Sequence, residues 1–208
     1  TLGKHKLEAT GSDDAGNTKS KTVEFTVVEK QPYKKQLLPG NNLVSLPASP
    51  ASGNSVKDIF AGAAVDLVVT YDPAALAGPW LIAQKGADGN WTGTLTAIDA
   101  LHAYWVRATG VTTMSVLLGE RGFQDAPPSI VLAKGWNLVP VVDVVSGGGS
   151  TVLGIAANKY LAGTSWTTVY GYITEEYKWQ RIDQGSTDEL KFGRGYWVYV
   201  PSATVITP

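Results

Sequence analysis

Alternation of polar and apolar residues at the start of the chain predicts β-strands rather than helices. Residues 6–10 alternate, residues 13–17 (Asp-Asp-Ala-Gly-Asn) carry turn-forming side chains, and residues 22–27 alternate again. This order predicts a β-hairpin. Strand geometry would place three apolar side chains of the second strand on one face: Val23, Phe25 and Val27. Because a two-stranded hairpin is marginally stable alone, this face is expected to need a partner sheet.

The string KHKLEATGSDDAGNTKSKTVEFTV, residues 4–27, resembles the last two strands of bacterial immunoglobulin-like domains. Such a sandwich has about seven strands and about 100 residues, so the resemblance implies that residues 1–30 are only its C-terminal hairpin. Either the chain was cut inside such a domain, or the hairpin completes a sheet that belongs to something else. Residues 31–36 are then expected to form an exposed linker.

The rest of the chain carries one pattern twice. Four anchors recur in the same order: residues 40–47 with 135–141, Val56 and Ile59 with Val152 and Ile155, Trp91 with Trp179, and residues 103–106 with 195–198. We therefore expect two duplicated β modules, residues 37–118 and 130–208, separated by a joint over residues 119–129. Each module would be a small β-sandwich or barrel with one short helix at its Val-x-x-Ile segment. The predicted fold class is all-β.

Two strings of the second copy, KGWNLVPV near its start and FGRGYWVYVP near its end, resemble a repeat of large extracellular and surface-layer-like proteins of bacteria and archaea. That repeat often follows immunoglobulin-like domains. The first copy departs from the pattern, because Asn41 stands where the pattern has Trp, and Leu101-His102-Ala103 replaces its Gly-x-Gly. The resemblance implies a secreted or cell-surface structural module near the C-terminus of a multidomain protein.

Composition excludes several classes of function. The 208 residues include 17 Lys and Arg, 18 Asp and Glu, and no Cys, with a formal net charge of -1. Without a basic excess, nucleic acid is a poor partner, and without Cys there are no disulfides, thiolate metal sites or thiol nucleophiles. We expect no membrane span, because no apolar run reaches about 18 residues. The chain also starts without a signal-peptide pattern, so it is either cytosolic or the mature part of a longer exported chain.

The sequence predicts no catalytic residues, no cofactor and no enzyme activity. Its two histidines, His5 and His102, lie far apart and outside any Ser-His-Asp or His-Glu-x-x-His arrangement. Adjacent carboxylates occur at residues 13–14, 175–176 and 188–189. Neighbours on a strand point to opposite faces, so we interpret these pairs as solvated loop charges.

Two further patterns are weak. Asp13, Asp14 and Asn17 supply oxygen ligands that suit calcium, but their spacing does not fit an EF-hand loop. Turn formation explains the same three residues, and we favour it over calcium. Asn90 begins an Asn-x-Thr glycosylation acceptor pattern, which has meaning only in a cell that glycosylates its surface proteins.

Tryptophan is the richest signal in the sequence. Three Trp residues occupy anchor positions in apolar runs and are expected in the core: Trp105, Trp136 and Trp197. The other four have polar or Gly neighbours and are expected to be partly exposed: Trp80, Trp91, Trp166 and Trp179. Exposed rings would stack on sugars or anchor a protein interface.

We interpret the chain as a non-enzymatic structural or adhesive part of an extracellular, cell-surface prokaryotic protein. It would act through assembly, with other copies of itself or neighbouring surface-protein domains as partners. The alternative is a carbohydrate-binding module that uses the exposed Trp residues to bind polysaccharide. A third hypothesis is the accessory domain of a hydrolase whose catalytic part precedes residue 1.

Overall fold

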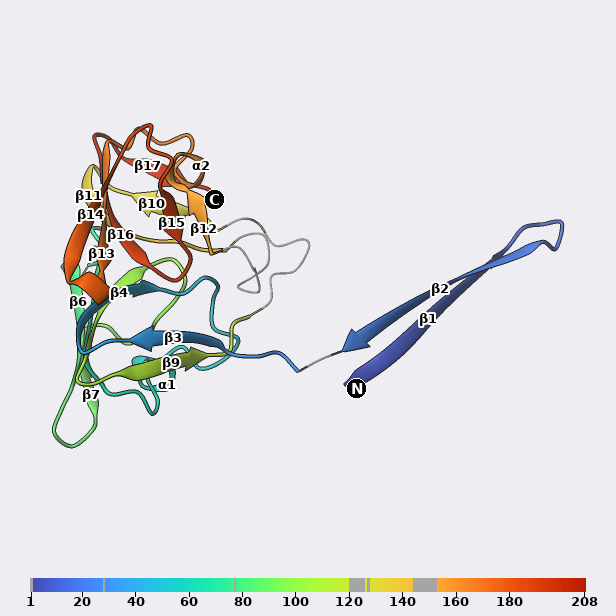
Figure 1. Ribbon diagram of the computed structural model, residues 1–208, viewed down its shortest axis with the longest axis horizontal. Coiled ribbons are helices and arrows are strands. Elements are labelled where there is room, and N and C mark those ends of the chain that lie inside the picture. Colours follow the sequence, from blue (N-terminus) through green and yellow to red (C-terminus); the bar gives the residue numbers. More distant parts are fainter. Residues whose placement is uncertain (1, 28, 77, 120–125, 127, 144–152) are drawn as a thin grey trace. The chain divides into compact units, whose positions relative to one another are not determined.

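Antiparallel strands make up most of the structure, as Figure 1 shows. Helices in the described part of the chain are limited to two of four residues and one 3-10 turn. The predicted all-β fold class is therefore confirmed, and no described helix is long and apolar enough to cross a membrane. The computed structural model describes residues 2–27, 29–76, 78–119, 126, 128–143 and 153–208.

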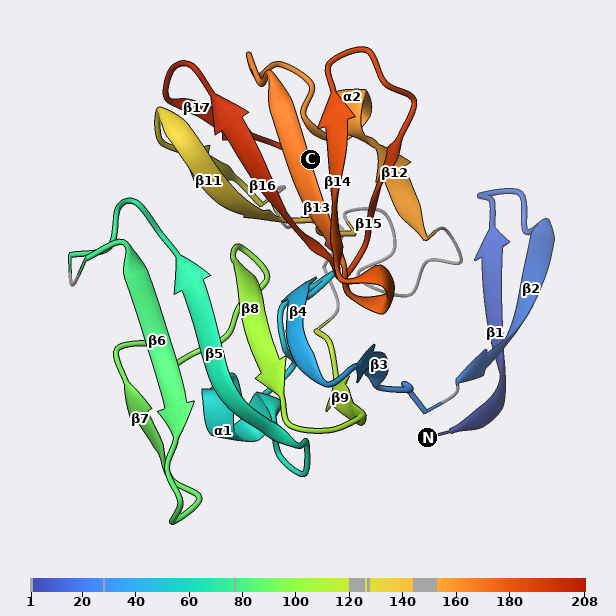
Figure 2. The same cartoon turned by 60° about the vertical axis from the view of Figure 1, so that its left-hand side comes forward.

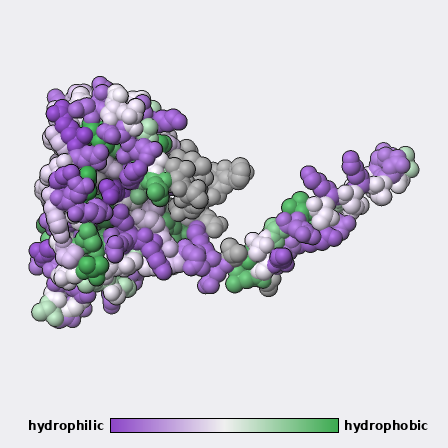
Figure 3. Space-filling view, in the orientation of Figure 1, coloured by the Kyte–Doolittle hydropathy of each residue, from purple (hydrophilic) through white to green (hydrophobic). Residues whose placement is uncertain are grey.

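The first compact unit, Thr1–Gln31, is the expected hairpin. Strand β1 (Gly3–Ser12) pairs antiparallel with β2 (Thr18–Val27) along its whole length. All side chains of the two strands are exposed except that of His5, which is half-buried and stacks on Phe25. Figure 3 shows hydrophobic residues at the hairpin surface. The hairpin therefore has an apolar face that the described residues of its own unit leave uncovered.

The second unit, Pro32–Pro208, consists of two halves, residues 33–118 and residues 130–206 (Figure 2). The first half has a five-stranded antiparallel sheet in the order β4 (Gly40–Ser45), β8 (Ala103–Ala108), β5 (Val65–Tyr71), β6 (Trp80–Lys85) and β7 (Trp91–Gly93). The second half has a four-stranded sheet in the order β11 (Gly135–Pro140), β16 (Gly195–Val200), β13 (Thr168–Ile173) and β14 (Lys178–Asp183). In both sheets the opening strand pairs with a late strand, which in turn pairs with the first strand of a hairpin.

Three two-stranded pairs accompany these sheets: β3 (Tyr33–Leu37) with β9 (Thr112–Val116), β10 (Ile130–Leu132) with β17 (Thr204–Ile206), and β12 (Gly154–Ala156) with β15 (Glu189–Lys191). The helices are α1 (Val56–Ile59), α2 (Ala157–Tyr160) and the 3-10 turn η1 (Thr174–Glu176). Ser55 caps α1, because its hydroxyl accepts a hydrogen bond from the Asp58 N–H at 3.1 Å. In the described residues, each half thus has one α-helical turn after its opening strand.

Two boundaries differ from the prediction. The linker expected over residues 31–36 is shorter, because β3 begins at Tyr33 and pairs with β9. The sequence predicted a helical turn at Val152–Ile155, and this is wrong for Ile155, which lies in β12 opposite Leu190. Helix α2 begins directly after that strand. The start of the expected turn and most of the joint over residues 119–129 lie outside the described residues.

One buried asparagine in each half makes the same hydrogen bonds to the turn before its strand, and Asn42 also donates to the Val106 carbonyl at 3.3 Å. Asn42 accepts a hydrogen bond from the Leu38 N–H at 3.0 Å and donates to the Leu38 carbonyl at 2.8 Å. Asn137 accepts from the Ala133 N–H at 2.9 Å and donates to the Ala133 carbonyl at 2.8 Å. Each side chain therefore satisfies the backbone of the turn that leads into the first strand of its sheet.

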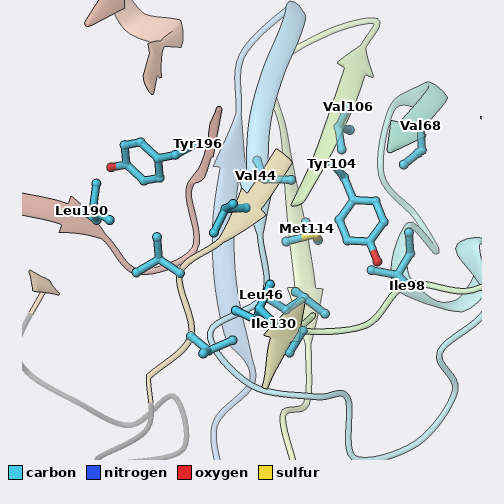
Figure 4. Close-up of a cluster of buried hydrophobic side chains, with 14 of the residues drawn as sticks. Val44, Leu46, Val68, Ile98, Tyr104, Val106, Met114, Ile130, Leu190 and Tyr196 are labelled. Carbon is cyan, nitrogen blue, oxygen red and sulfur yellow. The ribbon is translucent and has the colours of Figure 1, made fainter. Parts of the chain in front are cut away.

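Both halves contribute to one hydrophobic core, part of which is drawn in Figure 4. Val44 and Met114 of the first half belong to the same buried cluster as Ile130, Leu190 and Tyr196 of the second half. All five side chains are at least 94% buried. The two halves therefore share a core and do not form two independent domains.

A smaller cluster joins the opposite faces of the two large sheets. Leu43, Ala103 and Leu138 are buried in it, and four aromatic rings pack against them: Tyr71, Trp105, Tyr172 and Trp197. A Cβ on Gly195 would lie 2.6 Å from the Ala103 Cβ, so this position requires glycine for the close approach of β16 to β8. The candidate site described below contains aromatic rings that pack against this cluster.

Candidate functional site

Aromatic side chains gather on the sheet faces that point away from the shared core. In β16, Tyr196 and Val198 point into the core, so Trp197 and Tyr199 point to the opposite face. The same alternation places Trp105 of β8 on the outer face of its sheet, between core residues on either side. Strand geometry therefore exposes a row of aromatic rings on each sheet.

The first aromatic trio consists of Tyr71, Trp80 and Trp197. Tyr71 of β5 lies directly opposite Trp80 of β6, and their ring centroids are 4.9 Å apart. Trp197 comes from the other half, and its ring lies 5.4 Å from Tyr71 and 6.0 Å from Trp80. The interplanar angles lie between 53° and 65°, so ring edges meet ring faces, as aromatic pairs prefer.

The second aromatic trio consists of Tyr172, Trp179 and Trp105. Tyr172 of β13 lies directly opposite Trp179 of β14, with ring centroids 5.4 Å apart. Trp105 comes from the first half and lies 5.2 Å from Tyr172 and 5.7 Å from Trp179. Each trio thus combines a hairpin pair of one half with a strand Trp of the other half, and the two trios hold the halves together.

The strand register corrects one expected equivalence. Trp179 was expected to match Trp91, but its position opposite Tyr172 matches that of Trp80 opposite Tyr71. Trp91 begins β7, where it is half-buried against the shared core, with its ring 6.3 Å from that of Phe60. The reason is a difference in strand number, since β7 has no counterpart in the four-stranded sheet.

The second half extends its aromatic surface beyond the trio. The Trp136 ring lies 5.3 Å from Tyr199 and 5.8 Å from Tyr170, and Tyr170 lies 6.3 Å from Trp179. The strand pairings place three different residues at the matching positions of the first half: Asn41, Val69 and Arg107. The aromatic surface is therefore asymmetric and spreads over β11, β13 and β14.

Six of these aromatic residues line an open hollow of about 610 Å³, here called the aromatic hollow: Tyr71, Trp80, Trp136, Tyr170, Trp179 and Trp197. Three of its Trp side chains are about half exposed, at 47% for Trp80, 41% for Trp136 and 50% for Trp179. None of the six carries a charge at neutral pH. An exposed apolar hollow of this kind is therefore a candidate binding site.

The arrangement suits a ligand with flat apolar faces and polar edges. Indole and phenol rings offer broad faces for stacking, and the phenol hydroxyls offer hydrogen bonds at the margin. A pyranose ring has this amphipathic form, because its C–H groups make an apolar face and its hydroxyls point outward. Nucleic-acid bases also stack, but the net charge of -1 gives no electrostatic attraction for a phosphate backbone.

A second, smaller pocket of about 250 Å³ lies where β3 and β4 meet the end of β13 and η1. It is here called the cationic pocket, because two cations and one carboxylate are among its lining residues: Lys35, Gln36, Leu38, Asn42, Leu43, Val44, Tyr172, Thr174, Glu175 and Arg194. Arg194 Nη2 lies 3.5 Å from Glu175 Oε1. Burial and the Arg194 charge lower the pKa of Lys35, although Glu175 acts in the opposite direction.

His102 belongs to a cluster with two aspartates, Asp99 and Asp72. Its Nδ1 lies 2.8 Å from Asp99 Oδ1, and its Nε2 lies 3.8 Å from Asp72 Oδ2. The hydrogen bond with Asp99 raises the pKa of His102, against the opposing effect of burial. Burial acts to raise the pKa of Asp99, but its hydrogen bonds, foremost that with His102, outweigh burial and lower it.

The structure places the four Trp residues that the sequence singled out for binding in three different settings. Trp91 is half-buried against the shared core and does not line the hollow. Trp80 and Trp179 are half exposed and line the aromatic hollow. Trp166 was expected to be exposed, but it is only 3% exposed and belongs to the shared core, so that expectation is wrong. Trp136 was expected in the core and is instead 41% exposed in the hollow.

Sequence reasoning missed four lining residues of the hollow: Tyr71, Trp136, Tyr170 and Trp197. Trp197 was placed in the core with Trp105, and both are in fact half-buried against the smaller cluster. Neighbouring side chains of a strand point to opposite faces. Had Asn137 been assigned to the inner face, Trp136 beside it would have been assigned to the outer face.

The remaining candidates lie at turns. Asp13 Oδ1 accepts hydrogen bonds from the Ala15 and Asn17 N–H groups at 3.0 and 2.9 Å, and these bonds, with that from the Asn17 side chain, lower the pKa of Asp13. The carboxylate thus closes the hairpin turn, and Asp14 is exposed beside it. Asn90 lies in the exposed turn before β7, with its Nδ2 donating to Asp88 at 2.7 Å. Among the described residues, no group of three or more His, Asp or Glu side chains could hold a metal ion.

Comparisons with known proteins do not indicate which ligand or function this site has. No protein-family model, curated protein or solved structure matches the chain. The site must therefore be interpreted from its own geometry.

Proposed function

We propose that this chain is a non-enzymatic adhesive module of an extracellular, cell-surface prokaryotic protein, and that it binds polysaccharide in the aromatic hollow. The observation that carries this proposal is a hollow lined by six aromatic residues, three of them half-exposed Trp. Rigid aromatic rings lose little conformational entropy on binding, so such a surface binds without prior ordering. The extracellular location rests on the resemblance to repeats of surface-layer-like proteins.

The open form of the hollow favours a sugar chain over an apolar peptide. A polysaccharide leaves most of its hydroxyls in water and needs only one face of each ring covered. Stacking of a planar ring on an aromatic side chain is worth about 1–3 kcal/mol where it has been measured for bases. Two or three stacked sugar residues would therefore reach micromolar to millimolar affinity, enough for adhesion through many copies.

A retention experiment with paired variants tests this proposal. The full chain is run through native gels that contain cellulose derivative, mannan, soluble chitin or β-glucan. We expect at least one polysaccharide to retard the wild type, and the Trp80→Ala, Trp179→Ala double variant to lose that retardation. Both side chains are half exposed, so the double variant should remain folded.

Tyr177→Asn is the matched control. Tyr177 is an exposed aromatic residue, at 62%, that does not line the hollow. Its φ of 52° is left-handed, a conformation that Asn tolerates well. Retardation that survives the double variant, or that the control also abolishes, would refute binding at the hollow.

A second candidate function, assembly, is favoured by the hairpin. Leu7 lies opposite Val23 on its apolar face, and Phe25 and Val27 lie further along, all at least 37% exposed. A neighbouring β-sheet would cover these side chains, either another copy of this chain or the rest of an immunoglobulin-like sandwich.

Charge substitutions on the two faces of the hairpin test assembly. Val23→Lys with Phe25→Lys places two charges on the apolar face, whereas Thr22→Lys with Thr26→Lys places the same charges on the opposite face. If the hairpin assembles the protein, light scattering should show an oligomer that only the first variant dissociates. A wild-type monomer at all concentrations would refute self-assembly.

We also infer that residues 1–30 are the C-terminal hairpin of an immunoglobulin-like domain and that the two following halves are copies of one module. The equivalent hydrogen bonds of Asn42 and Asn137 support the duplication. The tyrosine hydroxyls add to it, because Tyr104 accepts from the Asp99 N–H at 2.9 Å and Tyr196 from the Lys191 N–H at 2.8 Å. In both cases the donor lies five residues before the tyrosine.

A further inference from the structure

The cationic pocket carries more positive charge than its own residues neutralise. Lys35 of β3 and Arg194, in the turn before β16, both line it, whereas Glu175 of η1 is its single lining carboxylate. Glu176, the next residue along, already pairs with Lys178. One excess positive charge therefore lies in a partly enclosed space.

Neither cation is fully satisfied. Within the described residues, the Lys35 side chain makes no hydrogen bond or ion pair, and the only ion-pair partner of the Arg194 side chain is Glu175, at the long distance of 3.5 Å. The Arg194 side chain is 28% exposed and that of Glu175 is 59% exposed, so the carboxylate lies further toward solvent. A partly desolvated cation gains most from a charged partner that fits its donors.

The electrostatics agree with this geometry. Desolvation and the neighbouring Arg194 guanidinium lower the pKa of Lys35, and Glu175 compensates only in part. A second carboxylate in the pocket would favour the charged lysine and would receive hydrogen bonds from the planar fork of the guanidinium. Gln36, Thr174 and Tyr172 also line the pocket, and their side chains carry an amide or a hydroxyl, which are neutral donors.

We propose that the cationic pocket receives the carboxylate of an acidic sugar residue, so that the polysaccharide held at the aromatic hollow contains uronic acids. The chain as a whole has a net charge of -1 and does not attract polyanions, so recognition of the acid must be local. At about 250 Å³ the pocket suits one sugar residue and not a whole chain.

The two sites are connected through one edge-to-face pair of rings. This step of the inference rests on the proposed function, because it takes the hollow to hold a sugar chain. Tyr172 lines the cationic pocket, and its ring centroid lies 5.4 Å from that of Trp179, which lines the aromatic hollow. The two sites thus have lining residues in direct contact, so one sugar chain bound over Trp179 would place a neighbouring residue near the pocket.

Oligogalacturonate and its fully methyl-esterified form make a matched pair of probes, since they differ only at the carboxyl group, which is an anion in the acid and a neutral methyl ester in the other. Calorimetric titration of the full chain should show that the acid binds about tenfold more tightly than the ester, as one charge-assisted hydrogen bond would give. Lys35→Met and Arg194→Gln should each abolish this preference and leave binding of the ester unchanged. Lys34→Met removes the same charge from an exposed neighbouring position of β3 and should keep the preference.

The outcomes separate the two proposals. Equal binding of acid and ester overturns the acidic-sugar inference and leaves polysaccharide binding intact. If neither oligomer binds, amide chemical shifts on titration with free galacturonic acid decide the inference independently of the hollow. Shifts centred on Lys35 and Arg194 that exceed those with acetate or inorganic phosphate support it, and equal or smaller shifts overturn it.

Discussion

The two halves of the second unit have the same inner face and different outer faces. Inside, Asn42 and Asn137 make the same backbone hydrogen bonds, and strands of both halves share one core. Outside, the first half has Asn41, Val69 and Arg107 where the second half has aromatic rings. Backbone satisfaction and packing leave little freedom for inner residues, whereas outer residues can vary without loss of the fold. A specific function is therefore to be sought on the outer faces, where the second half adds aromatic rings to those of the first half, Tyr71 and Trp80.

Trp166 and Trp80 show how differently a buried Trp and a half-exposed Trp should contribute to stability. Trp166 is 3% exposed in the core, so Trp166→Ala should lower the free energy of unfolding by about 3–5 kcal/mol. Trp80 is 47% exposed but contacts the rings of Tyr71 and Trp197, so Trp80→Ala should cost about 1–2 kcal/mol. Urea denaturation of both variants measures the difference. Similar losses for the two would mean that the hollow is part of the core.

The two asparagines test whether the inner faces are equivalent. Asn42→Ala and Asn137→Ala each leave a buried turn without its hydrogen-bond partners, and each should cost about 1–3 kcal/mol. Equilibrium unfolding of both variants should give losses of free energy that agree within about 0.5 kcal/mol. A loss confined to one variant would contradict the equivalence.

His102 provides the smallest expected effect. It lies directly before β8, and Arg194 takes the matching position directly before β16 in the second half. The folded state raises the pKa of His102 above its ordinary value of 6.5, so the protonated form stabilises the fold. That contribution is fully present below pH 6.5 and is lost as the pH rises through the folded pKa. We expect His102→Gln to remove a pH dependence of up to about 1 kcal/mol.

Thermal unfolding of wild type and His102→Gln between pH 5 and 9 measures this effect. The range stays above the lowered pKa of Asp99, so that carboxylate remains ionised throughout. The stability curves of the two proteins should differ most at low pH and converge at high pH. A gap that widened toward high pH would contradict the assigned role of the pair.

Much of the fold could be predicted from local pattern, because alternation over ten-residue strands and the Asp13 turn determine the hairpin without long-range contacts. The burial of individual Trp residues could not. Trp166 lies outside any strand, between α2 and β13, so only tertiary packing decides its exposure. Around Trp136 the pattern misleads, because Asn137 points inward for its hydrogen bonds and the apolar Trp points outward.

The equivalence of Trp80 and Trp179 shows a second limit of sequence reasoning. Spacing along the chain favoured Trp91 as the equivalent of Trp179, because spacing alone takes no account of an additional strand or of loop length. Only the strand pairings, Tyr71 with Trp80 and Tyr172 with Trp179, reveal which positions match. The hollow also combines residues of both halves, and its formation requires the two sheets to dock.

The most direct test of this account gives the second half the outer residues of the first. In the full chain, Trp136→Asn with Tyr170→Val replaces two rings of the hollow by the residues at the matching positions, Asn41 and Val69. Calorimetric titration with the polysaccharide that retards the wild type should show affinity lowered at least about tenfold, the equivalent of one lost stacking contact. The unfolding temperature should change little, because both side chains lie on the outer face. Unchanged affinity in a folded variant would contradict the claim that the aromatic hollow is the binding site.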